Sequence, residues 1–192
     1  VPLVRIGKND PIHIKRVMDA GAHGIIVPMV NTVEDAKRAI DALYYPPIGN
    51  RGAGLGRAHN YGIGFEEYKK WADKEVILIV QIEHIKGVKN IESILSLELI
   101  DGFIVGPYDL SGSLGVPQEW DHPEYLAAME KVHKVLSETD KVGGYHVVHS
   151  NHQELIDKVC QGYKFIAYGD DMVFFAEKIS EEIKFINTQN FK

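Results

Sequence analysis

This sequence has almost no cysteine, no long apolar run and no excess of positive charge. Its 192 residues include one cysteine, Cys160, which can form no disulfide within the chain and is typical of a reducing compartment. We therefore expect a cytoplasmic protein, with Cys160 as a packed thiol near the end of a helix. No apolar run approaches the roughly 20 residues that span a bilayer, so no membrane partner is predicted.

The charge balance also limits the possible partners. Lys and Arg number 21 against 27 Asp and Glu, a formal net charge of −6, which gives no general attraction for nucleic acid. With 45% hydrophobic and 25% charged residues and no low-complexity tract, the composition is typical of a globular protein. No linker or repeat divides the chain, so we expect one domain over residues 1–192.

Short β-rich runs alternate with longer helical patterns along the chain. The expected strands are 2–6, 24–30, 76–83, 101–106, 143–148 and 164–168, and the expected helices are 10–20, 32–43, 65–72, 88–97, 122–138, 151–161 and 171–186. Asp10, Asn31 and Ser150 are the expected helix N-caps. Continuous apolar strands separated by helices predict a parallel sheet covered on both faces.

Polar residues collect at the carboxyl ends of these strands, which favours an α/β fold of the (β/α)8 TIM-barrel type. The residues are Arg5, Gln81, Glu83, Asp109, His149 and Asp170. Only six βα units are found, whereas a complete barrel has eight and about 250 residues. We expect a barrel that lacks its first two βα units in this chain, and a native protein with about two more units before Val1.

The Gly-rich stretch RGAGLGRAH, residues 51–59, does not follow a strand directly, so a dinucleotide-binding loop is not expected. The glycines predict a flexible loop at the active site or at an interface. His59 lies in this loop beside Arg57, and we expect it to be able to move over a substrate.

Glu83 and Asp109 each follow an apolar run, in VQIE and GPYD. At the ends of neighbouring parallel strands the two carboxylates would repel each other unless they shared a cation, and hard oxygen ligands favour Mg²⁺ or Mn²⁺. Alternatively, one acid caps the following helix and the other pairs with a Lys or Arg. Spacing alone leaves both interpretations open.

Arg5 ends the first expected strand and is suited to bidentate binding of a carboxylate, or to a structural ion pair with Glu83 or Asp109. Gln81 lies two residues before Glu83 and points to the same side of the strand. In HVVHSNH, His146 and His149 fall on opposite faces if the strand continues, so no zinc site is expected there. Asp170 and Asp171 after the last strand disfavour a phosphorylated substrate.

Four segments resemble the HpcH/HpaI aldolase family, the class II pyruvate aldolases related to the citrate lyase β subunit. They are VPMVNTVEDAKRAI (27–40), YYPPIGNRGAGLGRA (44–58), VQIEHIKGVKNIESIL (80–95) and IDGFIVGPYDLSGSLG (100–115). The resemblance runs from Val1 to about Ala176. It implies a (β/α)8 barrel in which Glu83 and Asp109 hold Mg²⁺, Mn²⁺ or Co²⁺.

The resemblance also implies roles for other residues. Arg5 matches the substrate-binding arginine, Gln81 matches a glutamine of the site, and Gly106 and Pro107 match the pyruvate-binding turn. The implied reaction cleaves a 4-hydroxy-2-oxo acid to pyruvate and an aldehyde, through an enolate stabilised by the metal and by Arg5. The family's His–Asp pair for proton transfer would lie before Val1, so we expect residues 1–192 alone to bind metal but turn over poorly.

Two other functions remain open from the sequence. One is a CoA-ester lyase of the citrate lyase β or malyl-CoA type, and the other is an inactive barrel fragment that acts as an assembly partner. We also expect a homo-oligomer in which segment 171–186 supplies part of the contact, because it is more apolar than one helix face normally buries and because the resemblance points to helix exchange between subunits.

Overall fold

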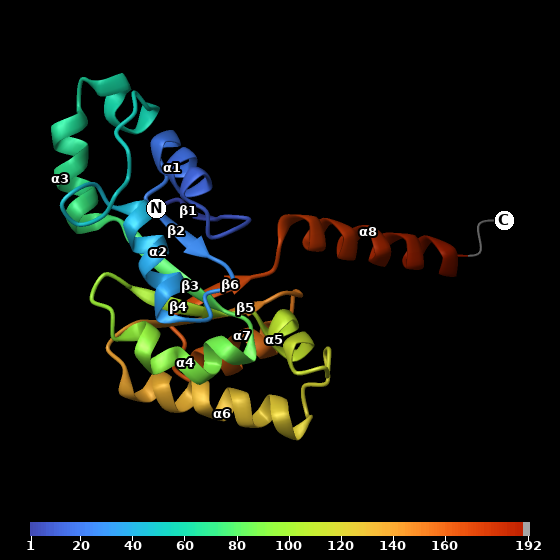
Figure 1. The fold of residues 1–192 in the computed structure, drawn as a ribbon. Helices are drawn as coiled ribbons and strands as arrows, with labels where there is room; N and C mark the ends of the chain where they lie inside the picture. The colour runs from blue at the N-terminus through green and yellow to red at the C-terminus, as the bar shows by residue number, and fades with distance from the viewer. Residues whose placement is uncertain (190–192) are drawn as a thin grey trace.

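The computed structural model describes residues 1–189 and contains one sheet of six parallel strands (Figure 1). The strand order along the sheet is the same as the order along the chain. The strands are β1 (Leu3–Arg5), β2 (Gly24–Val27), β3 (Ile77–Ile82), β4 (Gly102–Val105), β5 (Val142–Val147) and β6 (Phe165–Tyr168). The sheet is curled like part of a TIM barrel, as the sequence predicts in its coarse outline.

Helices connect the strands. They are α1 (Pro11–Ala20), α2 (Val33–Leu43), the 3-10 helix η1 (Arg57–Gly62), α3 (Phe65–Glu75), α4 (Ile85–Leu95), α5 (Pro107–Ser113), α6 (Pro123–Glu138), α7 (His152–Cys160) and α8 (Asp171–Thr188). The short helices η1 and α5 were not expected from the sequence. None of the helices within residues 1–189 is long and apolar enough to cross a membrane.

The two faces of the sheet differ, because side chains alternate along each strand. Leu78, Val80 and Ile82 of β3 are fully buried in the main core. α1 packs on α2, α2 on α4, and α4 on α6 over this face. Gln81, between Val80 and Ile82, points to the other face and lines a pocket there. The helices thus cover the outer face, and the second face is the inside of the curled sheet, where Ile79 and Ile104 are also buried.

Two of the three expected helix caps are displaced by one residue. Asp10 caps α1 as predicted, by accepting a hydrogen bond from the N–H of Ile12. Thr32 rather than Asn31 caps α2, because Thr32 forms a reciprocal capping box with Asp35. Asn151 rather than Ser150 caps α7, because its side chain accepts from the N–H of Glu154.

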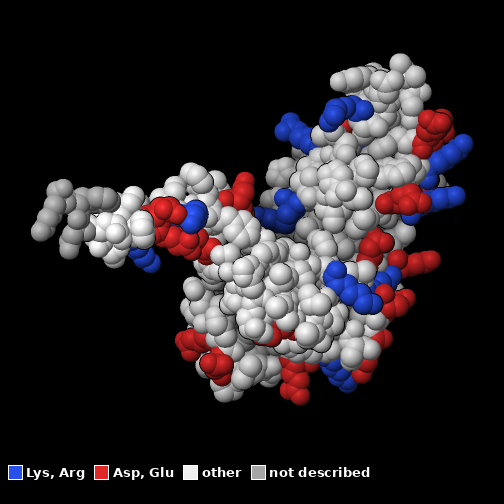
Figure 2. Space-filling model, turned by 180° about the vertical axis from the view of Figure 1, so that it is seen from behind, with Lys and Arg blue, Asp and Glu red and all other residues white. Residues whose placement is uncertain are grey.

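Helix α8 projects away from the rest of the protein (Figure 1), and none of its residues is buried. Its large exposed side chains are Met172, Phe174, Phe175, Ile179, Ile183, Phe185 and Ile186. Seen from behind, much of the body carries no charged side chains, while the projecting helix carries both signs (Figure 2). Cys160 is also exposed, so the prediction of a packed thiol is wrong.

Candidate active site

A pocket of about 460 Å³ opens at the carboxyl ends of the strands, on the inner face of the curled sheet. All six residues that the sequence singled out for metal or substrate line this pocket: Arg5, Gln81, Glu83, Gly106, Pro107 and Asp109. They come from β1, from the carboxyl end of β3 and the residue after it, and from the N-cap and first turn of α5. The fold thus brings together side chains that are up to 104 positions apart in the chain, from Arg5 to Asp109.

Glu83 is the buried charge of this pocket, with 5% of its surface exposed. Its Oε1 accepts a hydrogen bond from the backbone N–H of Met29 at 2.7 Å, and its Oε2 accepts one from Gln81 Nε2 at 2.6 Å. Burial raises the pKa of Glu83, the N–H of Met29 opposes that rise, and the nearby Asp109 carboxylate adds to it. Within residues 1–189, neither Glu83 nor Asp109 forms an ion pair with a Lys or Arg.

The sequence suggested that Asp109 ends a strand. In the structure, Asp109 lies in the first turn of α5. A carboxylate is favourable there because the amino end of a helix carries partial positive charge. His84 rather than Glu83 caps α4, and Gly106 occupies the N-cap position of α5. Neither Glu83 nor Asp109 therefore occupies a helix N-cap position, which was the alternative to metal binding.

Gly106 allows β4 and β3 to approach closely at this pocket. A Cβ atom at position 106 would lie 2.9 Å from Gln81 Nε2 and 3.1 Å from Glu83 Oε2, closer than side chains normally pack. Any larger residue would push Gln81 and Glu83 apart. The pairing of Gln81 with Glu83 thus depends on a glycine from the neighbouring strand end.

The donor set suits a hard divalent cation. One buried carboxylate without a basic partner faces a second, exposed carboxylate, and oxygen ligands are those that Mg²⁺ and Mn²⁺ prefer. Within residues 1–189, no group of three or more His, Cys, Asp or Glu side chains is placed to hold a metal ion. Two protein carboxylates would leave the remaining positions of an ion to water and substrate.

Some residues of the pocket were missed or misjudged from the sequence. Tyr108 and His146 also line it. Asp170, which the sequence placed at a strand end, lines the pocket as well and caps α8. Met29 contributes through its backbone and has a φ of 54°, a left-handed conformation that is uncommon outside glycine. No sequence pattern predicts that backbone conformation of Met29. His149 instead pairs with Glu177 of α8, at 3.0 Å from Nδ1 to Oε1.

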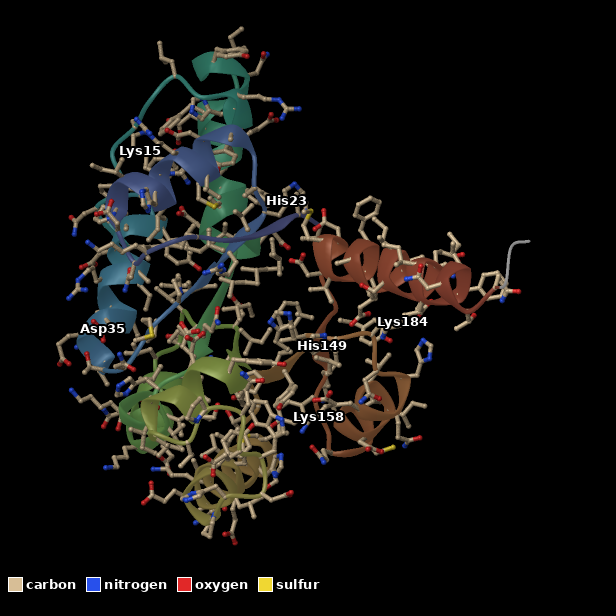
Figure 3. The ribbon with its side chains drawn as sticks, turned by 90° about the vertical axis from the view of Figure 1, so that its right-hand side faces the viewer. Lys15, His23, Asp35, His149, Lys158 and Lys184 are labelled. Carbon is tan, nitrogen blue, oxygen red and sulfur yellow. The ribbon has the colours of Figure 1, made fainter. Side chains whose placement is uncertain are left out.

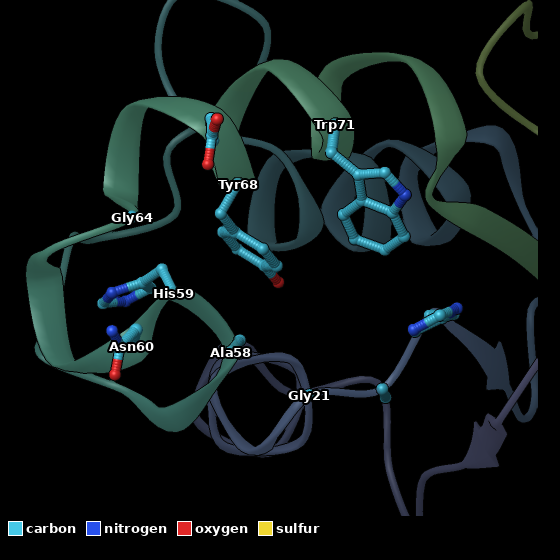
Figure 4. Close-up of a pocket in the computed structure, with 10 residues that line it drawn as sticks. Gly21, Ala58, His59, Asn60, Gly64, Tyr68 and Trp71 are labelled. Carbon is cyan, nitrogen blue, oxygen red and sulfur yellow. The ribbon is translucent and has the colours of Figure 1, made fainter.

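The Gly-rich loop lies at the opposite end of the sheet, near the α1–β2 turn. A second pocket of about 420 Å³ lies between this loop and α3, with Tyr68 and Trp71 on one side and Gly21 and Ala58 on the other (Figure 4). The α1–β2 turn precedes β2, so this pocket is far from the carboxyl ends of the strands. No residue of 51–59 lines the pocket of Glu83, so the prediction of an active-site loop is wrong for this chain, while a place at an interface stays a prediction.

His59 is fixed within that loop and does not move over a substrate. Its side chain is 2% exposed, and its two ring nitrogens lie 3.2 Å from the N of Gly56 and 3.0 Å from the N of Gly62. Its ring also contacts Phe65 edge-on, at 5.4 Å between centroids. The prediction that His59 contacts a substrate is wrong, because its ring is buried and both of its nitrogens contact the backbone around η1.

Comparison with known proteins identifies the family of this chain. The family model for HpcH/HpaI aldolase/citrate lyase matches residues 1–177. A 2-keto-3-deoxy-L-rhamnonate aldolase of Klebsiella pneumoniae is 34% identical over 184 residues, which cover 95% of this chain and 68% of the relative. A 4-hydroxy-2-oxo-heptane-1,7-dioate aldolase of Shigella flexneri is 36% identical over 177 residues, covering 91% and 65%.

A solved structure shows the same architecture. The crystal structure of an HpcH/HpaI aldolase from Desulfitobacterium hafniense DCB-2 superposes with a TM-score of 0.88 and 29% identity, covering 99% of this chain and 74% of that one. The chain thus spans about two thirds to three quarters of the length of these proteins. From its matched residues, its fold and its relatives, this chain belongs to the HpcH/HpaI aldolase/citrate lyase family.

Proposed function

We propose that the pocket around Glu83 is the active site of a divalent-metal-dependent aldolase, which cleaves a 4-hydroxy-2-oxo acid into pyruvate and an aldehyde. Residues 1–192 would form a single aldolase domain that contributes six strands of a (β/α)8 barrel. The observation that carries this proposal is a buried carboxylate, Glu83, without a basic partner among residues 1–189 and facing Asp109. Relatives named as aldolases support it over the CoA-ester lyase and the inactive fragment.

Glu83 and Asp109 would hold Mg²⁺, Mn²⁺ or Co²⁺, which when bound supplies Lewis-acid stabilisation of negative charge on the 2-oxo acid. Gln81 keeps the Glu83 carboxylate oriented through its 2.6 Å hydrogen bond. Arg5 reaches the same pocket from β1 and would pair with the keto oxygen. As a general base, for which the resemblance implies a His–Asp pair, takes the proton of the C4 hydroxyl, the C3–C4 bond would break and its electrons would pass into the pyruvate enolate. Gly106 and Pro107 border the space where the pyruvate carbons would lie.

Metal binding tests the proposal most directly. Calorimetric titration of the protein with Mn²⁺ should show one site, and Glu83→Ala and Asp109→Ala should each abolish it. Glu130→Ala, which removes an exposed acid of α6 outside the pocket, is the matched control and should bind as the wild type does. Wild-type affinity in either pocket variant would overturn the assignment.

The proposal includes a homo-oligomer in which α8 packs against a second copy. The support is physical: an 18-residue helix with no buried residue exposes Phe175, Ile179 and Ile183 to water. Light scattering at low micromolar concentration should give a multiple of the 21.5 kDa chain mass, and Ile183→Asp should lower it. A monomer mass for the wild type would contradict this.

A further inference from the structure

A third pocket, of about 530 Å³, lies between β5, α6 and α7. Four of its lining residues, Pro107, Tyr108, His146 and Val148, also line the pocket of Glu83. The two pockets therefore adjoin over the carboxyl ends of β4 and β5. None of the roles described above uses the part of this pocket that extends between the helices.

Lys158 is the positive charge in this pocket, and it lies on the side of α7 that faces the body of the protein (Figure 3). Its Nζ lies 4.1 Å from the centroid of the Tyr145 ring, a cation–π contact. Within residues 1–189 it forms no ion pair. Burial lowers the pKa of Lys158, while Glu154 and Asp157 oppose that shift. A half-buried ammonium whose hydrogens are not taken up by the protein is free to bind an anion.

Aromatic rings connect Lys158 to the pocket of Glu83. Tyr108 contacts Trp120 and Trp120 contacts Tyr125, with 5.3 Å between centroids in each case. The hydroxyl of Tyr125 lies 3.4 Å from that of Tyr145, whose ring lies under Lys158. This aromatic wall suits the hydrocarbon part of a ligand, since rings bury apolar area with little loss of side-chain entropy.

A further polar atom of this pocket has no partner. The Nε2 of His133 is buried, and within residues 1–189 it makes no hydrogen bond. Buried polar atoms normally have a partner, so an orphaned one beside a cavity indicates a ligand or an ordered water. His133 and Lys158 line the same pocket, which therefore has one ammonium donor, one unpartnered imidazole nitrogen and an apolar wall.

We propose that this pocket binds the carboxylate of an organic acid at the Lys158 ammonium, with the hydrocarbon part of the acid against Tyr108, Trp120 and Tyr125. A carboxylate fits better than a phosphate, because one lysine with Glu154 and Asp157 nearby suits a single negative charge. The acid has two potential sources. It is either the aldehyde half of the aldol substrate or a separate acid, and only the first source rests on the proposed function.

Binding can be followed through Trp120, since the protein has two tryptophans and Trp71→Phe leaves Trp120 as the sole reporter. Titration with 3-phenylpropionate should change Trp120 fluorescence with saturation, and the neutral 3-phenylpropionamide should not. Lys158→Met should weaken binding at least tenfold, and Lys158→Arg should retain it. Lys134→Met, an equal loss of charge on the exposed side of α6, should have no effect. Calorimetry of probe binding to the protein that retains Trp71 checks that the Trp71→Phe substitution itself does not cause the observed binding.

Two outcomes would overturn the proposal: no saturable binding of 3-phenylpropionate by the wild type, or equal affinity in Lys158→Met. Glu83→Ala should bind the probe as the wild type does. Probe binding at Lys158 can therefore be tested even if the proposed aldolase function is wrong. The source is decided by KM in aldol addition to pyruvate, comparing 4-oxobutanoate with butanal. A KM raised by Lys158→Met only for 4-oxobutanoate identifies the substrate. An unchanged KM with lost probe binding identifies a separate acid.

Discussion

Among residues 1–189, each end of the curled sheet contains one buried charged side chain, and the surroundings of the two differ. At the amino ends of the strands, the Arg51 side chain is fully buried and its Nη2 lies 2.6 Å from Asp19 Oδ1. Its guanidinium also donates to the hydroxyl of Tyr68 and lies 4.6 Å from the centroid of the Tyr45 ring. At the carboxyl ends, Glu83 accepts two hydrogen bonds but faces another carboxylate.

The difference distinguishes a charged side chain that stabilises the fold, Arg51, from one that is available to bind a ligand, Glu83. Arg51 links the start of the Gly-rich loop to α1 and α3. Its charge is paired with Asp19, and its guanidinium also contacts Tyr68 and Tyr45, although its buried Nε has no hydrogen-bond partner within residues 1–189. Glu83 is held in place by neutral donors and forms no ion pair within residues 1–189, although the nearby charge of Arg5 opposes the rise of its pKa. A buried carboxylate without an ion-pair partner is suited to binding a cation. The comparison predicts that the two ends respond differently to substitution.

The largest effect should come from Arg51→Met. It removes the buried partner of Asp19 and two aromatic contacts, and should lower the free energy of unfolding by about 3 kcal/mol in urea denaturation. Metal affinity of the folded fraction should be unchanged. Arg38→Met, which breaks a 3.4 Å pair between Asp35 and a guanidinium that is 54% exposed, should cost about 0.5 kcal/mol or less. Equal losses in the two variants would contradict a special role for Arg51.

Arg5→Lys should act on chemistry rather than on stability. It keeps the charge but loses the planar fork, so turnover should fall on the order of a hundredfold, about 2.7 kcal/mol. Oxalate, a planar dianion that resembles the pyruvate enolate, should bind more weakly in calorimetry, which checks the role independently of turnover. Arg57→Lys at the other end of the sheet is the control. Unchanged kinetics and oxalate binding in Arg5→Lys would exclude the proposed contact.

The smallest expected effect is the pH dependence of stability. Its sign should be opposite for Glu83 and for Asp19, which lie at the two ends of the sheet. The folded-state pKa of Glu83 is raised, chiefly by burial, so its contribution to stability is complete below its unfolded pKa and is lost as pH rises through the folded pKa. For Asp19, burial alone would raise the pKa, but hydrogen bonds from Lys15 and Arg51 lower it. Its contribution is present above the unfolded pKa and is lost as pH falls through the folded one.

Glu83→Gln should therefore raise the urea midpoint of the metal-free protein at pH 7 and flatten its dependence on pH between about 7 and 4. Gln81 can turn its amide to present an oxygen to the new side chain, so the hydrogen bond is kept. Asp19→Asn should lower the midpoint at pH 7 instead. A lower midpoint for Glu83→Gln at that pH would mean that the negative charge of Glu83 is structurally compensated after all.

The sequence predicts the composition of the site well because strand periodicity and strand ends are local properties. Arg5, Gln81 and Glu83 line one pocket, since the carboxyl ends of parallel strands converge, and their roles in binding and catalysis stay predictions. Of the two places predicted for the Gly-rich loop, the active site was wrong, because glycine indicates backbone freedom and not which end of a sheet a loop will reach, and a place at an interface stays a prediction. The burial of Arg51 depends on Asp19 and Tyr68, and pairing across 32 and 17 positions is not visible in sequence spacing.

Other misses come from conformations that tertiary contacts impose. Met29 adopts a positive φ, and in that conformation its N–H reaches Glu83. Asn31 was the expected cap, but Thr32 caps α2 because Asp35 completes the reciprocal pair with it. Cys160 ends an amphipathic pattern, yet α7 packs too loosely to bury it. These are the points at which a local pattern is overruled by packing.

The identity of strand order and chain order bears on how the protein is made. Each strand from β2 onward pairs with the strand synthesised just before it, so no strand must wait for a later partner. At about 5–20 residues per second, synthesis of 192 residues takes roughly 10–40 s, ample time for each βα unit to dock as it leaves the ribosome. Protease protection of stalled nascent chains of increasing length should extend one strand at a time, and protection that appeared only at full length would exclude such sequential folding.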